Sequence, residues 1–165
     1  MKAALIGLGM VSGTYADAVR GLPGIAISHV HARRDHSRAA FLAQHPDLGA
    51  ADAPSLADIA GNPDIDFVIL TTPPNARAQI VAQMVEAGKP ILMEKPVERS
   101  LQGATDLVER CEDAGIPLGI VLQHRARPVV ADLRNVLPDL GALRAVEVAV
   151  PWWRGQAYYD EPGRG

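Results

Sequence analysis

The chain has 165 residues, enough for one full domain and the start of another. Hydrophobic residues at 48% and charged residues at 21% are typical of a soluble globular protein, and the net charge of -3 gives no reason to expect nucleic acid or an anionic membrane as a partner. The single cysteine, Cys111, excludes an internal disulfide and suits a reducing cytoplasm. No apolar run reaches the roughly 18 residues of a membrane span.

Short apolar runs alternate with amphipathic helices over residues 1–123, the pattern of a parallel sheet covered by helices on both faces. Strands are expected at 3–6, 25–31, 67–70, 90–93 and 117–122. Helices are expected at 11–20, 37–44, 80–85 and 101–114, with a short one opened by a capping box of Ser55 and Asp58. Cys111 lies at helical spacing among apolar residues and should be buried. The prediction is a doubly wound α/β Rossmann domain over 1–123.

Residues 124–165 have a different character. A helix is expected at 128–137, and Val146, Val148 and Val150 alternate as in a half-buried strand. Both tryptophans and two of the three tyrosines then fall within 151–165, where little chain remains to pack against them. The segment is predicted to be the incomplete start of a second domain, which the family resemblance described below implies to be an α+β substrate and oligomerisation domain. Its aromatic residues would form the packing surface of that domain, or else a sugar-stacking platform.

A glycine turn, Gly7-Leu8-Gly9-Met10-Val11-Ser12, closes the first strand. Dinucleotide binding requires a tight turn at Gly7 and bare backbone at Gly9, so that a pyrophosphate can approach the N-terminus of the following helix. Ser12 replaces the third glycine of that pattern, where any small residue packs. All six residues are expected to contact the cofactor; a plain β–α turn is the alternative.

Basic residues follow the second strand. Arg33 occupies the position where an acidic residue would bind the ribose hydroxyls of NAD, and Arg34 and Arg38 lie nearby. A guanidinium matches the 2′-phosphate of NADP in geometry and charge, so the pattern favours NADP. The alternative is a solvated basic face, with Asp35 free to bind a ribose.

Polar residues also end the next two strands. In an open α/β sheet ligands bind beyond the carboxyl ends of the strands, so these segments should meet the glycine turn at one edge. Thr71, Thr72, Pro73 and Asn75 are expected to line the cofactor site. Lys95 can hydrogen-bond the substrate oxygen that interconverts between hydroxyl and carbonyl during hydride transfer, and Glu94 can orient that lysine or bind a cofactor ribose. A surface ion pair beside a turn proline is the alternative for this segment.

The chain resembles the N-terminal half of the glucose-fructose oxidoreductase / inositol dehydrogenase / rhizopine-catabolism family. The residues that carry the resemblance are Ile6-Gly7-Leu8-Gly9, 64–73, 87–96 (ending Glu94-Lys95-Pro96), Arg125 and Pro128. The resemblance implies a bound NAD(P), oxidation or reduction of a sugar, cyclitol or similar polyol, and a dehydrogenase in which Lys95 is catalytic. It also implies a cofactor contact from Arg125, a cis peptide bond before Pro96 and a homo-oligomer for the full-length protein.

The chain departs from that family at two positions and at its end. Tyr15 and Arg77 lie where many members have histidine. The chain also stops before an aspartate/histidine pair that the resemblance implies in a following domain. It is therefore predicted to be a fragment that turns over poorly or not at all by itself.

Two other functions are alternatives to the dehydrogenase. One is a nucleotide-sensing module without redox turnover; the other, an unrelated methyltransferase-like or CoA-binding Rossmann domain, is disfavoured by the position of the Glu-Lys-Pro segment. The histidines show no metal-ligand spacing, so no metal site is expected. His124 would be a solvated loop residue, with a place facing the pocket as the alternative.

Overall fold

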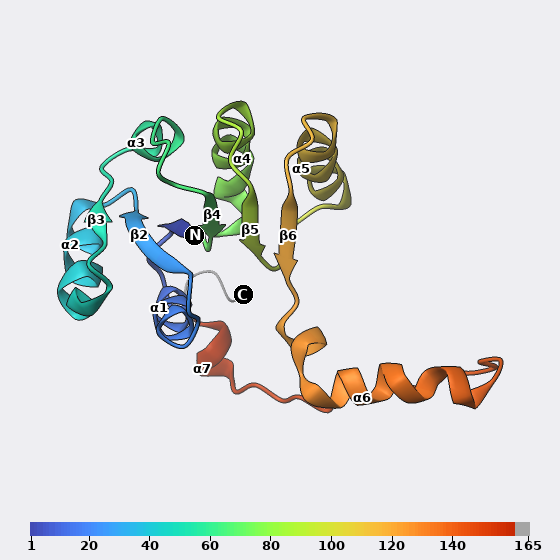
Figure 1. The fold of residues 1–165 in the computed structure, drawn as a ribbon. Helices are drawn as coiled ribbons and strands as arrows, with labels where there is room; N and C mark the ends of the chain where they lie inside the picture. Colours follow the sequence, from blue (N-terminus) through green and yellow to red (C-terminus); the bar gives the residue numbers. More distant parts are fainter. Residues whose placement is uncertain (161–165) are drawn as a thin grey trace. The chain divides into compact units, whose positions relative to one another are not determined.

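The computed structural model describes residues 1–160, and the chain divides into two compact units, Met1–Val121 and a second that begins at Leu122. The last five residues of the predicted second domain lie outside the described residues. The first unit is built on a six-stranded parallel sheet with strand order β3-β2-β1-β4-β5-β6 (Figure 1). The predicted doubly wound α/β architecture is therefore confirmed.

Each strand and helix expected in the first unit is present within about three residues of its expected range, and β3 is a strand that the sequence did not predict. The strands are β1 (Lys2–Ile6), β2 (Ala26–His31), β3 (Ala51–Asp52), β4 (Phe67–Leu70), β5 (Ile91–Glu94) and β6 (Leu118–Val121). The helices are α1 (Ser12–Arg20), α2 (Asp35–Gln44), α3 (Leu56–Ala60), α4 (Arg77–Glu86) and α5 (Leu101–Asp113), with 3₁₀ turns η1 (Pro46–Leu48) and η2 (Pro74–Ala76). The capping box of Ser55 and Asp58 is present, and α4 extends the expected 80–85 segment in both directions.

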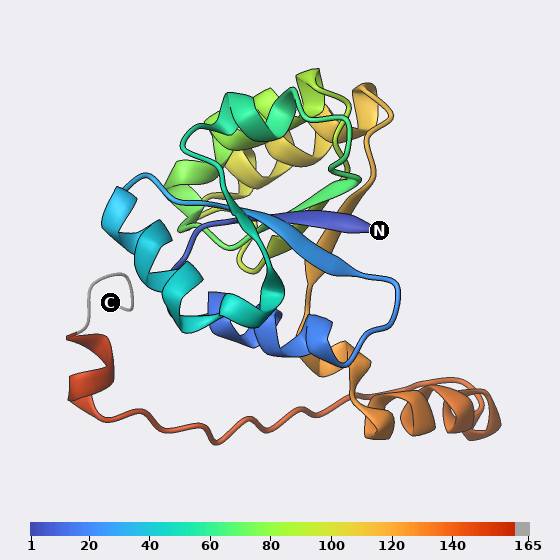
Figure 2. The same ribbon diagram turned by 60° about the vertical axis from the view of Figure 1, so that its left-hand side comes forward.

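Helices cover both faces of the sheet, and β1 shows why. Its residues alternate between two separate clusters of buried side chains: Ala3 and Leu5 pack with α1 and α2, and Ala4 and Ile6 pack with α3, α4 and α5. The helices of the two clusters lie on opposite faces of the sheet (Figure 2). A strand that is buried on both faces needs a continuous apolar run, which the sequence supplies. Cys111 is fully buried in the α5 side of the core, as expected.

The strand ends place four loops at one edge. β1 pairs in parallel with both β2 and β4, so that Ile6 lies opposite His31 on one side and Leu70 on the other, and β4 pairs in the same way with β5. The residues that follow these strands therefore leave the sheet at its carboxyl edge. The expected meeting of the glycine turn with the segments after β2, β4 and β5 is confirmed.

The second unit contains η3 (Gln123–Ala126), α6 (Pro128–Val136), η4 (Leu137–Leu140) and α7 (Gln156–Tyr159). The predicted strand at 146–150 is wrong: these residues form no strand, and Val146, Val148 and Val150 are each more than 70% exposed. Alternation alone does not make a strand, because a strand needs a partner for its backbone groups, and none pairs with this segment among residues 1–160. Within the part of the chain that is described, no helix is long and apolar enough to cross a membrane.

Candidate functional site

Gly7 is required by the packing of the protein itself. Its φ of +100° lies in the region that favours glycine. A side chain there would place its Cβ 2.7 Å from the Thr72 nitrogen and 2.9 Å from the Thr71 carbonyl carbon. The Gly7 N–H donates to the carbonyl of His31 at 2.9 Å, which fixes the turn against β2 as well. Gly7 is the point where the ends of three strands come into contact.

Gly9 is different, because nothing in the protein requires a glycine there. A Cβ at this position would have no atom within 4 Å, and the φ of Gly9 is not in the left-handed region. Ser12 closes the turn, since its buried hydroxyl donates to the carbonyl of Gly9 at 2.6 Å. Val11 then begins α1 without a side-chain cap. An open, bare backbone before an uncapped helix start fits the approach of a pyrophosphate.

The three arginines after β2 have different environments. Arg33 and Arg34 are exposed, and their side chains make no ion pair or hydrogen bond with other residues of the described chain. Arg38 is 5% exposed and pairs with Asp52 at 2.5 Å and Asp35 at 3.1 Å. Its guanidinium therefore ties α2 to β3, whereas Arg33 and Arg34 are available to a ligand.

The segment after β4 is bound tightly to the glycine turn. The buried hydroxyl of Thr71 donates to the carbonyls of Ile6, at 3.2 Å, and Gly7. The hydroxyl of Thr72 is buried and has no hydrogen-bond partner within residues 1–160. Pro73 and Asn75 are exposed. Thr72 thus leaves an unsatisfied polar group beside the turn, which a native protein rarely does without a reason.

A buried arginine connects this segment to the one after β5. Arg77, the first residue of α4, is 2% exposed. Its Nε and Nη2 donate to the carbonyl of Thr72 at 3.0 and 2.8 Å. Its Nη1 donates to the carbonyls of Glu94 and Pro96, with Val97 farther away at 3.4 Å. One guanidinium therefore holds two loops of the carboxyl edge together.

Glu94 is held from a third direction. The hydroxyl of Tyr15, on α1, donates to Oε1 of Glu94 at 2.9 Å, and the backbone N–H of Lys95 donates to Oε2 at 3.0 Å. Burial, followed by this hydrogen bond to a carboxylate, raises the pKa of Tyr15 well above its usual range. Both carboxylate oxygens are engaged within the protein, which favours the orienting role among the two that the sequence allows for Glu94.

Lys95 itself is exposed, and its ammonium makes no hydrogen bond or ion pair with any described residue. The surface ion pair weighed for this segment is therefore absent among residues 1–160. The peptide bond between Lys95 and Pro96 is cis, as expected. The edge thus presents a free cation whose backbone is fixed on both sides.

Arg125, another predicted cofactor residue, lies on η3 in the second unit, next to His124. Both side chains are exposed. In that unit the His124 ring lies edge-on to Trp152, with the ring centroids 6.1 Å apart, and Arg154 stacks over Trp152 at 4.2 Å. In the described part of the chain, no cluster of three histidine, cysteine or carboxylate side chains could hold a metal ion.

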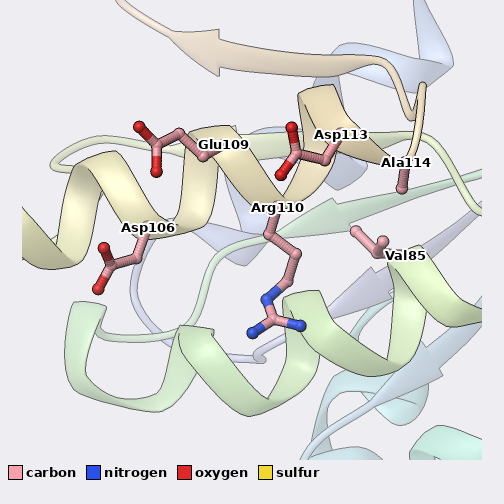
Figure 3. A pocket seen from close by; sticks show the side chains of 6 residues that line it. All are labelled: Val85, Asp106, Glu109, Arg110, Asp113 and Ala114. Atoms are coloured by element: carbon pink, nitrogen blue, oxygen red, sulfur yellow. The ribbon is translucent and has the colours of Figure 1, made fainter.

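A shallow hollow lies elsewhere in the first unit, between α4 and α5 (Figure 3). It is lined by Val85, Asp106, Glu109, Arg110, Asp113 and Ala114. Val85 is next to the last residue of α4 and Asp113 ends α5, so the hollow reaches the ends of these helices that lie away from the carboxyl edge. It is open and bordered by exposed charged side chains, and it contains none of the strand-end residues.

The roles of Arg77 and Tyr15 were not predicted from the sequence, where they were noted only as departures from the family. One signal was present for Arg77. A cation at the first position of a helix lies at the positive end of the helix dipole, which is unfavourable unless another group binds it. Here backbone carbonyls bind it.

The comparisons with known proteins cover most of the chain. The model of the oxidoreductase family with an NAD-binding Rossmann fold matches residues 1–121. Myo-inositol dehydrogenase Hyg17 of Streptomyces leeuwenhoekii is 31% identical over 134 residues, which are 81% of this chain and 40% of that protein.

Two solved structures share the fold. The WlbA dehydrogenase of Chromobacterium violaceum, in complex with NADH and UDP-GlcNAcA, has a TM-score of 0.74 and 24% identity over 84% of this chain and 40% of its own. The biliverdin reductase of Synechocystis, in complex with biliverdin and NADP+, has a TM-score of 0.68 and 19% identity over 86% of this chain and 44% of its own. The chain thus spans less than half the length of each of these proteins.

Proposed function

We propose that this chain, which belongs to the oxidoreductase family with an NAD-binding Rossmann fold, binds a nicotinamide dinucleotide at the carboxyl edge of its sheet and holds it for hydride transfer with a sugar-like substrate. The observation that carries the proposal is the meeting, at one edge, of the open backbone of Gly9 and the free ammonium of Lys95. The open backbone of Gly9 leaves room for a phosphate to approach the start of α1, and the ammonium of Lys95 is available to a substrate at the same edge.

The proposed cofactor contacts come from several loops of the edge. The pyrophosphate is assigned to the turn from Gly7 to Ser12, where backbone N–H groups and the start of α1 attract a negative group. The unsatisfied hydroxyl of Thr72 is assigned to the cofactor as well, with Asn75 beside it. Arg125 is kept as a contact on the strength of the family resemblance alone.

The form of the cofactor depends on the loop after β2. Arg33 and Arg34 are exposed and unpaired within residues 1–160, and Asp35 is already shared with Arg38. Free guanidiniums suit a 2′-phosphate better than the hydroxyls of an unmodified ribose. We therefore propose that the chain prefers NADP over NAD.

Lys95 is the proposed catalytic residue. The bound cofactor would supply or accept the hydride, and the hydroxyl proton would pass to or from the aspartate/histidine pair that the family resemblance implies in a following domain. The ammonium of Lys95 donates a hydrogen bond to the substrate oxygen that becomes or ceases to be a carbonyl. A fixed positive charge stabilises the alkoxide character that develops on that oxygen. Glu94 orients the segment by accepting the N–H of Lys95 and the hydroxyl of Tyr15.

For the substrate and the oligomeric state of the whole protein, we propose only a general class. The inositol dehydrogenase relative supports a cyclitol, sugar or related polyol as the substrate class. A cytoplasmic location and a homo-oligomer stay predictions, as do poor turnover by the 165-residue chain alone and the identity of 124–165 as part of a substrate domain. The regulatory alternative is binding without turnover, and the place of Lys95 at the carboxyl edge favours the enzyme over it.

The proposal is tested by calorimetric titration of the 165-residue chain with NADPH and NADH in parallel. We expect both to bind, NADPH more tightly, because the two arginines add charge-assisted hydrogen bonds to the 2′-phosphate. S-adenosylmethionine and coenzyme A serve as controls, since they are ligands of other Rossmann domains, and should give no heat. The proposal fails if neither nicotinamide cofactor binds, or if one of the two controls binds instead.

A further inference from the structure

The guanidinium of Arg77 donates from all three of its nitrogens to backbone carbonyls. It lies inside the first unit with no carboxylate at ion-pair distance among the described residues. Nε and Nη2 converge on the carbonyl of Thr72, and Nη1 turns to the opposite loop. A buried cation is costly unless its donors are satisfied, and here carbonyl oxygens satisfy them.

The acceptors in the second loop bracket one residue. The carbonyl of Glu94 lies directly before Lys95 and the carbonyl of Pro96 directly after it, and the same Nη1 binds both. The backbone of Lys95 is therefore anchored on each side, while its ammonium is exposed and unpaired within residues 1–160. Because the hydrogen bonds from Arg77 fix the backbone of Lys95 and leave its side chain free, they determine which positions the ammonium can occupy.

Arginine is the residue type that this arrangement requires. Its planar fork carries donors that point in divergent directions, so that Thr72 can be bound on one side and the lysine loop on the other. A lysine could place only a point charge between them. The chain thus uses Arg77 to couple the position of the loop after β5 to the loop after β4, which itself packs on Gly7.

We propose that Arg77 is the positioning residue for Lys95. Through the carbonyls of Glu94 and Pro96 it holds the lysine at the distance from the glycine turn that a bound cofactor and its substrate require. The inference deepens the function proposed above and rests on it for the role of Lys95. It makes no claim that Arg77 touches either ligand.

The first test measures the loop itself and needs no substrate. Hydrogen–deuterium exchange of the 165-residue chain, followed by mass spectrometry, compares the wild type with R77A and R77K. We expect the peptide that covers 94–99 to exchange at least tenfold faster in both variants, with β1 and α1 unchanged. Guanidinium chloride at about 50 mM, well below denaturing concentrations, should restore protection in R77A by refilling the site. The variant R20A, which removes an exposed, ion-paired arginine of α1, is the matched control.

The outcomes separate positioning from general stabilisation. Exchange that accelerates throughout the first unit, or that guanidinium does not reverse, would mean that Arg77 only stabilises the fold. Unchanged exchange at 94–99 would overturn the inference directly. If R77A does not fold, R77K decides alone, because it keeps the charge and loses the fork.

The second test links the loop to catalysis. In the full-length protein, with NADP+ as the hydride acceptor and myo-inositol and D-galactose as probe substrates, R77A should lower kcat by about 100-fold. The Kd of NADPH should stay within twofold of the wild type. The double variant R77A/K95M should be no slower than K95M, because a positioning residue has nothing left to position. Additive losses, or a loss of cofactor affinity in R77A, would contradict the inference. Failure of the wild type to bind NADPH or NADH would instead refute the proposed function, and the exchange measurement would still decide the role of Arg77 in the loop.

Discussion

On one side of the carboxyl edge, the loops after β1 and β2 present bare backbone at Gly9 and two exposed guanidiniums, Arg33 and Arg34. On the other side, the loops after β4 and β5 are tied by side chains that are buried or half-buried, above all Arg77 and Tyr15. The first half is open toward a ligand, and the second is braced from within the protein.

The contrast follows from what each half is proposed to do. A pyrophosphate is recognised by backbone N–H groups, so the first half needs space and little else. A catalytic ammonium must be held in one place, and misplacement by about 1 Å can cost on the order of 100-fold in rate. Mutations in the first half should therefore change binding, and mutations in the second should change position and stability. Gly7 belongs to both halves, because it packs on Thr72.

The largest effect on stability is expected for Gly7→Ala. The added Cβ would clash with backbone atoms of the β4 loop, and its φ would be strained, for a combined loss of about 3 kcal/mol in the free energy of unfolding. Gly24→Ala is the matched control, since Gly24 has a φ of +88° and no atom within 4 Å of a Cβ. Denaturant unfolding of both variants separates the effect of the clash from that of backbone strain. Equal losses in the free energy of unfolding would mean that the packing of Gly7 on Thr72 does not hold the two halves together.

A somewhat smaller effect is expected when Arg33 and Arg34 are both replaced by alanine. The double variant should bind NADPH about 2 kcal/mol more weakly and NADH almost unchanged, because only the 2′-phosphate loses its charge-assisted hydrogen bonds. Calorimetric titration gives both affinities. R20A/R110A removes the same charge from elsewhere on the chain and controls for long-range electrostatics. Equal losses for the two cofactors would overturn the assignment of these arginines.

Gly9→Ala should change binding and leave folding intact. A methyl group at this position has free space in the protein, so the free energy of unfolding should move by less than about 0.5 kcal/mol. Because it would occupy the space that we assign to the pyrophosphate, the affinity for NADPH should fall by about tenfold, or roughly 1.4 kcal/mol. Gly21→Ala, at the other end of α1, should leave the affinity unchanged. An unaltered affinity in Gly9→Ala would show that the ligand does not approach this backbone.

The smallest effect is expected for Tyr15→Phe, about 1 kcal/mol in the free energy of unfolding, from the lost hydrogen bond to Glu94. Burial and then Glu94 raise the pKa of Tyr15 above its ordinary value near 10. The folded state thus keeps a proton that the unfolded state releases above pH 10, so the stability of the wild type should fall as the pH rises past 10. When the free energy of unfolding is measured against pH, the fall above pH 10 should be smaller in Tyr15→Phe than in the wild type. The control variant Tyr159→Phe should keep the fall that Tyr15 causes.

Elements with a clear local pattern, either a continuous apolar run or a helical period, were predictable from the sequence. Elements that depend on pairing with another strand were not. Buried parallel strands are continuous apolar runs, so β1 and β4 were found, and their ends located the edge. β3, two residues with both side chains exposed, has no pattern to find. Residues 146–150 have the alternation of a strand and no partner among residues 1–160.

The same division applies to the candidate site. Glycines, strand-end cations and the Glu-Lys-Pro segment could be identified because each is local in sequence. The hydrogen bond from Tyr15 to Glu94 joins residues 79 positions apart, and Arg77 acts through carbonyl oxygens, which every residue has. Tyr15 carries no local signal of its contact, and the one signal for Arg77 is its unfavourable place at the start of α4. The partners of both residues are visible only in the folded chain.

Cys111 is the single cysteine of the chain and is fully enclosed by the core, and burial raises the pKa of its thiol. Such a thiol is nearly inert toward maleimides and other alkylating reagents. A cysteine introduced at an exposed position of the edge, for example at Asn75, would therefore be the only group that takes up a thiol-directed dye. One fluorophore could therefore be attached beside the proposed cofactor site without first replacing Cys111 in the core.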